Sequence, residues 1–146
     1  MKEKKIRDDL ITNTNEILSA TKEYISKFNM AASFSFTNND ATFKEISSNY
    51  RKLTTRLLHI ISVTDTLGAK LASLTLEADK AQNDKRAAQL SKLFENYCLW
   101  KEDVASFLSA SEGIFLKKED FKYAAALNQA QIFFTATENF NKTLKS

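Results

Sequence analysis

No proline interrupts this chain of 146 residues, and only two glycines, Gly68 and Gly113, occur in it. Average usage would supply roughly seven prolines and ten glycines in a chain of this length. Because both residue types disfavour helix interiors, their scarcity predicts a largely helical protein. It also excludes a glycine-rich phosphate-binding loop, which needs several glycines close together.

Cysteine and histidine, which often act in catalysis and metal binding, are also scarce. The single cysteine, Cys98, cannot form an internal disulfide, and the single histidine, His59, has no partner at metal-ligand spacing. A nucleophile pair of His59 and Cys98 is the one catalytic alternative. Against it, Cys98 lies in the apolar run from Tyr97 to Trp100, which predicts a buried, inert thiol. We therefore expect no enzyme activity, no metal and no cofactor.

The charge balance and hydropathy narrow the class of protein further. The net charge is only +3, with basic and acidic residues interspersed, which argues against nucleic acid as a partner. No run approaches the roughly 18 uncharged apolar residues of a transmembrane helix, and the first ten residues do not resemble a signal peptide. We expect one helical domain over residues 1–146, cytoplasmic or peripherally attached to a membrane.

Hydrophobic periodicity predicts four helices, at about residues 3–28, 41–80, 86–114 and 119–144. Asp40 or Thr42 is the expected N-cap of the second helix. The polar residues 82–84 are either a turn or part of a continuous helix, and we favour the turn. Gly113 is expected to end the third helix. Short connections of this kind predict an elongated antiparallel bundle of about four helices.

The second predicted helix carries apolar positions spaced alternately three and four residues apart, as in a coiled coil. A continuous helix over 41–80 would be about 60 Å long, so we expect it to project beyond the others. We expect this coiled-coil stripe to mediate self-association or assembly with a protein partner, although the sequence leaves open whether it packs within one chain. The stripe comprises Phe43, Ile46, Tyr50, Leu53, Leu57, Ile60, Thr64, Leu67, Leu71, Leu74, Ala78 and Ala81.

Four basic residues of the same helix, Lys44, Arg51, Lys52 and Arg56, cluster opposite much of the stripe. They are candidate contacts for anionic lipid headgroups or phosphates. A solvated helix face is the alternative and the favoured interpretation, since four charges make a small basic cluster.

Aromatic residues suggest two further contact sites. Phe34 and Phe36, in the first connection, either cap the end of the bundle or insert into a membrane or a partner, and capping is favoured. In the last helix, Phe133, Phe134 and Phe140 cannot all face one interior. Its expected buried side comprises Phe121, Ala124, Leu127, Ala130, Phe134, Thr137 and Leu144, with Ile132, Phe133 and Phe140 flanking it.

The segments 49–57 (NYRKLTTRL) and 66–72 (TLGAKLA) resemble the long early helix of BAR-superfamily proteins, including the sorting-nexin type. The resemblance covers about half of the chain and makes 85–107 the following helix. It implies an antiparallel dimer with a curved basic surface that binds anionic membranes. It also implies a lipid-facing role for Arg51, Lys52, Arg56 and Lys70.

The sequence thus favours a non-enzymatic helical interaction or scaffold protein. One alternative is a BAR-like peripheral membrane module. A small bacterial helical chaperone or effector is another.

Overall fold

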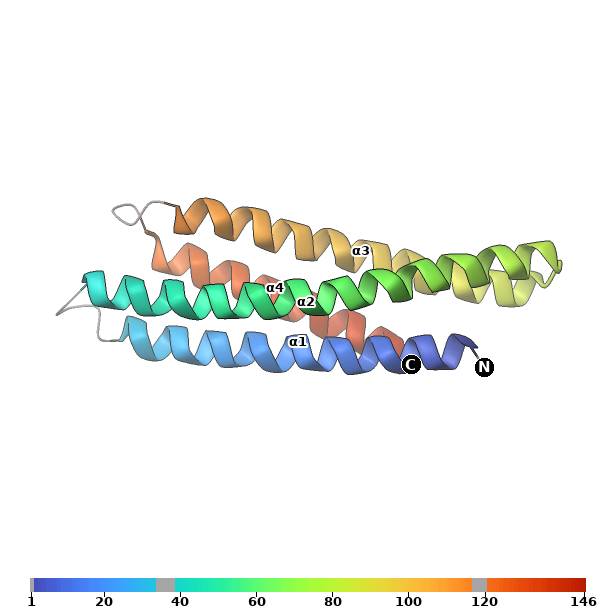
Figure 1. Cartoon of the computed structure of the whole chain (residues 1–146), viewed down its shortest axis with the longest axis horizontal. Helices are drawn as coiled ribbons and strands as arrows, with labels where there is room; N and C mark the ends of the chain where they lie inside the picture. The colour runs from blue at the N-terminus through green and yellow to red at the C-terminus, as the bar shows by residue number, and fades with distance from the viewer. Residues whose placement is uncertain (1, 34–38, 117–120) are drawn as a thin grey trace.

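The computed structural model describes residues 2–33, 39–116 and 121–146, and every element within them is a helix. The four helices are α1 (Lys2–Ala32), α2 (Asn39–Lys80), α3 (Asp84–Phe115) and α4 (Tyr123–Lys145), and they alternate in direction (Figure 1). Each helix packs against the one before it and the one after it, and α4 packs against α1. The predicted all-α helical bundle is therefore confirmed.

The bundle is longer on one side than on the other. With 42 residues α2 is about 60 Å long, whereas the 23 residues of α4 reach only about 35 Å. Figure 1 shows the end of α2 and the start of α3 extending together past the beginning of α1. The projection expected for the second helix is thus shared with α3. The buried residues Leu74, Ala78, Ala87 and Leu90 pack the base of this hairpin.

The turn expected at residues 82–84 joins α2 to α3. Gln82 adopts the left-handed region with φ of 56°, and its backbone N–H donates to the carbonyl of Asp79 at 3.0 Å. The side chain of Asn83 then accepts a hydrogen bond from the backbone N–H of Arg86, which caps the start of α3. The chain therefore reverses here instead of continuing as one helix.

Other helix ends differ from the predictions. Phe28 and Ala31 are buried, so α1 continues four residues past the expected end, to Ala32. Helix α2 starts at Asn39, before either expected N-cap. Gly113 does not end α3, because its φ is not positive and the helix runs on to Phe115.

Two predictions fall outside the described residues. These are the roles of Phe34 and Phe36 and the expected start of the last helix at 119.

The rotation of α4 about its axis also differs from the prediction. Phe133 and Phe140 are buried, Phe134 is half-buried and Ile132 is exposed. The rings of α3 explain this rotation, because Phe133 stacks on Phe107 and Phe140 stacks on Trp100. The buried face of α4 comprises Ala126, Ala130, Phe133, Thr137, Phe140, Asn141 and Leu144.

Candidate interaction surfaces

The coiled-coil stripe of α2 lies inside the bundle. Phe43 and Tyr50 are half-buried and Ala81 is exposed. Because α2 packs between α1 and α3, helices of the same chain cover the stripe, and a partner would have to displace them to reach it. The surfaces open to a partner are therefore others. The buried members of the stripe are Ile46, Leu53, Leu57, Ile60, Thr64, Leu67, Leu71, Leu74 and Ala78.

An apolar groove of about 380 Å³ lies between α2 and α3. Leu58 of α2 and Leu116 at the end of α3 stand exposed at it. Within it, the ring of Tyr50 stacks on Phe115 with 4.2 Å between their centroids. The groove is lined by Ser47, Tyr50, Arg51, Thr54, Leu58, Leu108, Glu112, Phe115 and Leu116.

One charge of each sign lines this α2–α3 groove. Arg51 belongs to the α2 wall and Glu112 to the α3 wall. Burial, with a smaller contribution from the Glu112 charge, raises the pKa of the Tyr50 hydroxyl. The groove thus combines an aromatic floor, exposed leucines and opposite charges on its two walls.

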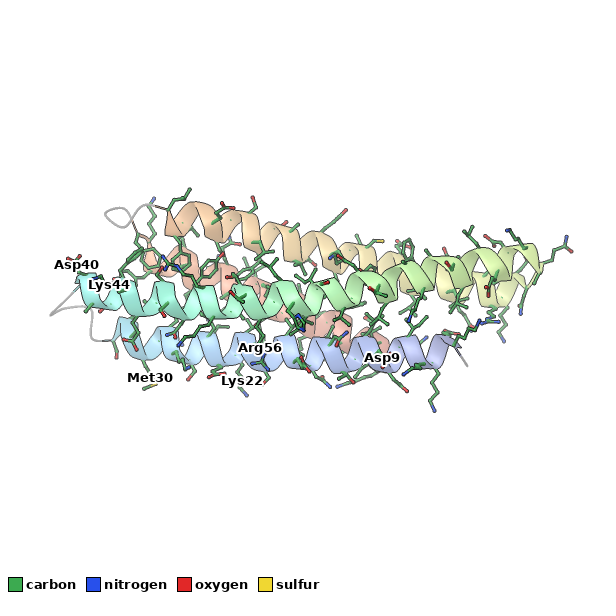
Figure 2. All side chains as sticks on the ribbon, viewed as in Figure 1. Asp9, Lys22, Met30, Asp40, Lys44 and Arg56 are labelled. Carbon is green, nitrogen blue, oxygen red and sulfur yellow. The ribbon has the colours of Figure 1, made fainter. Side chains whose placement is uncertain are left out.

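The four predicted basic residues, Lys44, Arg51, Lys52 and Arg56, are all exposed on α2. None of them forms an ion pair with another residue of the described segments. The last three line one shallow surface together with Ser48, Thr55 and His59, and Lys44 lies two turns earlier. Figure 2 shows Lys44 and Arg56 on the same side of the molecule, with Arg56 at the border between α2 and α1.

Lys52 and Arg56 also line a second groove, between α1 and α2. On the α1 side, the Lys27 ammonium lies 3.0 Å from the Glu23 carboxylate. This hydrogen bond from Lys27, helped by the more distant charges of Arg56 and Lys52, lowers the pKa of Glu23. The α1–α2 groove is lined by Ala20, Glu23, Tyr24, Lys27, Asn49, Lys52, Leu53 and Arg56.

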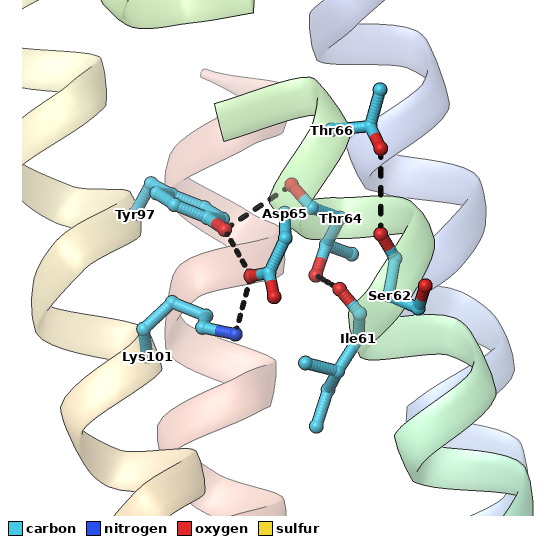
Figure 3. Close-up of polar contacts among 7 residues, drawn as sticks. All are labelled: Ile61, Ser62, Thr64, Asp65, Thr66, Tyr97 and Lys101. Atoms are coloured by element: carbon cyan, nitrogen blue, oxygen red, sulfur yellow. Dashed lines mark hydrogen bonds and ion pairs between the residues drawn. The ribbon is translucent and has the colours of Figure 1, made fainter. Parts of the chain in front are cut away.

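A polar cluster joins α2 to α3 farther along the bundle (Figure 3). The Tyr97 hydroxyl lies 3.1 Å from the carbonyl of Thr64 and 3.0 Å from Oδ1 of Asp65. Nζ of Lys101 donates to the same Asp65 oxygen at 2.6 Å. The hydrogen bond from Lys101, and to a smaller extent that from Tyr97, lowers the pKa of Asp65. Burial, together with the nearby Asp65 carboxylate, raises the pKa of the Tyr97 hydroxyl.

The same cluster explains one of the two glycines. The Tyr97 ring lies against Gly68, where a Cβ atom would approach Cε2 of the ring to 2.5 Å. Sequence reasoning missed this contact, because the partner of Gly68 lies on another helix. Since Tyr97 and Lys101 of α3 both donate to Asp65 of α2, we assign the cluster to holding α2 and α3 together.

The catalytic alternative gains no support from the placement of its members. Cys98 is exposed rather than buried, because it points away from the buried face formed by Leu93, Tyr97 and Trp100. His59 is exposed as well. Among the described residues, no three His, Cys, Asp or Glu side chains are grouped so that they could hold a metal ion.

Helix α2 is also the one described helix that is long and apolar enough, over Asp40–Lys80, to cross a membrane. This is weak evidence, because buried core helices meet the same criteria, and the apolar stripe of α2 faces the bundle core.

Comparison of the chain with protein-family models, with curated proteins and with solved structures gives no match.

Proposed function

We propose that this chain is a non-enzymatic helical interaction protein that self-associates through the α2–α3 groove. The observation that carries the proposal is the exposure of Leu58 and Leu116, 57% and 75%, at a groove floored by aromatic rings. Grouped exposed apolar side chains of this kind mark contact surfaces. Helix-on-helix packing would bury them, as in helix-in-groove recognition.

Charge favours a second copy of this chain as the occupant. In a two-fold dimer the same patch meets itself, and an axis along the groove would place Arg51 of each copy opposite Glu112 of the other. One cation and one anion on opposite walls make the patch self-complementary, which favours this pairing over a like-charged partner.

Glutamate substitutions in the groove test the proposal. We expect the wild-type chain to approach twice 16.6 kDa with rising concentration, as measured by light scattering. Leu58→Glu and Leu116→Glu should each raise the dimer dissociation constant at least about tenfold, because a carboxylate would be buried against apolar surface. Both residues are already exposed, so the fold should persist. Leu76→Glu is the matched control, because Leu76 is 60% exposed but lies outside the groove.

The charge pairing adds a second arm to this experiment. Arg51→Glu should weaken the dimer, and the double change Arg51→Glu with Glu112→Arg should restore it. A mass of 16.6 kDa at every concentration, or equal loss in the Leu76→Glu control, would contradict the proposed interface.

A second candidate function is peripheral membrane binding, which the BAR resemblance implies. The supporting observation is that Lys44, Arg51, Lys52 and Arg56 are exposed and form no ion pair among the described residues. Each basic residue near an anionic membrane contributes about 1 kcal/mol.

Charge reversal tests the membrane candidate. We expect binding to phosphatidylserine vesicles to fall by about a hundredfold when Arg51, Lys52 and Arg56 are all changed to Glu. The control reverses three exposed lysines on either side of the α2–α3 turn, Lys80, Lys85 and Lys92. Equal losses in both triple variants would show a non-specific charge effect, and unchanged binding would remove the basic face from the mechanism.

A further inference from the structure

The α1–α2 groove is lined by a tyrosine whose ring is buried and whose hydroxyl is open to the groove. Tyr24 is only 3% exposed and lines the groove. Within the described segments, its hydroxyl makes no hydrogen bond to another residue. The hydroxyl is not among the buried polar atoms that lack a partner, so solvent reaches it through the groove. The Tyr24 hydroxyl is therefore available as a donor to a ligand in the groove.

Positive charge surrounds this tyrosine. Lys27 is paired with Glu23, but Lys52 and Arg56 form no ion pair with any described residue. These two lie four residues apart, so they share one face of α2. The amide of Asn49, one turn before Leu53 on the same helix, adds a further donor at the groove. Two uncompensated cations and two neutral donors thus line one concave site.

We propose that the α1–α2 groove binds a phosphate monoester group through Tyr24, Asn49, Lys52 and Arg56. A phosphate monoester carries a charge of about −1.5 to −2 at neutral pH, which matches the two unpaired cations. The guanidinium of Arg56 can donate two parallel hydrogen bonds to phosphate oxygens, and Lys52 supplies a compact second charge.

The size of the groove limits how much of a phosphorylated ligand it can enclose. Its volume of about 210 Å³ is smaller than the pockets of about 300 to 1,000 Å³ that enclose whole drug-sized ligands. It therefore accommodates the phosphate and a short adjoining part of the ligand, such as a glycerol unit. The rest of the ligand extends into solvent or into a lipid layer.

Glu23 also lines this groove, and its negative charge opposes the binding of a phosphate. Its charge interacts with Lys27 and, more weakly, with Arg56 and Lys52, so it competes with the phosphate for them. Replacing this carboxylate by an uncharged amide should therefore strengthen binding.

Titration with glycerol phosphate, followed by ¹H–¹⁵N NMR of the full chain, tests the site. We expect saturable shifts centred on the side-chain amide of Asn49. Tyr24→Phe, which removes only the hydroxyl, should weaken binding several-fold, and Arg56→Gln at least about tenfold. Glu23→Gln should tighten it. Lys44→Gln is the matched control, because Lys44 is exposed on α2 but lies outside the groove.

Vesicles containing phosphatidic acid distinguish the source of the phosphate. Saturable binding of glycerol phosphate that Tyr24→Phe weakens identifies a soluble ester. Binding only to the vesicles, with the same sensitivity to Tyr24→Phe, identifies a lipid headgroup. The proposal is overturned if neither probe binds saturably, or if Tyr24→Phe and Arg56→Gln change binding no more than Lys44→Gln.

Discussion

Replacing Trp100 by alanine is expected to lower the free energy of unfolding by about 3–5 kcal/mol. Trp100 is only 1% exposed, and its indole stacks on Phe140 with 5.1 Å between the ring centroids. Its Nε1–H also donates to Oγ1 of Thr137 at 3.0 Å. Truncation would leave a cavity between α3 and α4 and remove that donor. Because small domains are stable by only about 5–15 kcal/mol, this loss is a large share of the total.

Urea unfolding followed by circular dichroism measures this effect. The adjacent residue gives a matched control, because Leu99 is 52% exposed and Leu99→Ala should change stability by no more than about 0.5 kcal/mol. Trp100→Phe separates the two contributions, since it keeps an aromatic ring but removes the hydrogen bond, at a cost of about 1 kcal/mol. A Trp100→Ala variant as stable as Leu99→Ala would contradict the packing of α3 on α4.

Replacing Gly68 by alanine is expected to destabilise the protein by about 1–3 kcal/mol. The added Cβ would lie 2.5 Å from Cε2 and 2.7 Å from Cζ of Tyr97, far inside van der Waals contact. The ring cannot simply move aside, because its hydroxyl is hydrogen-bonded to Thr64 and Asp65. The sign of the effect is diagnostic, since alanine is otherwise about 1 kcal/mol better than glycine in a helix.

The other glycine supplies the control for this prediction. A Cβ at Gly113 would meet nothing within 4 Å, so Gly113→Ala should stabilise the protein by about 0.5–1 kcal/mol. Both variants are compared in the same denaturant titration. Combining Gly68→Ala with Tyr97→Leu should recover part of the loss, as a double-mutant cycle would show. Stabilisation by Gly68→Ala would show that α2 and α3 do not approach this closely at Tyr97.

The sequence by itself determined that the chain forms four helices, and it determined which face of α2 is buried. The near absence of helix breakers and the regular apolar spacing are local properties, so they indicate helices without knowledge of any tertiary contact. They predicted the buried positions of α2, such as Leu57 and Leu71, and the turn at Gln82, where polar residues interrupt the pattern.

Only the tertiary structure decided which neighbour each face meets. In α4 several apolar faces compete, and stacking on Phe107 and Trp100 selected Phe133 and Phe140 for the core. Glycine is the residue that most often ends a helix, yet α3 continues past Gly113. The reason is that the half-buried Ile114 and Phe115 pack against the core.

The candidate surfaces also depend on how the helices pack against one another. Spacing along α2 predicted that Lys52 and Arg56 share an exposed face, because that is a property of one helix. It could not place them beside Tyr24 of α1, nor Arg51 across a groove from Glu112 of α3. Those pairs form only when the ring of four helices closes, because closure sets the rotation and the height of each helix relative to its neighbours.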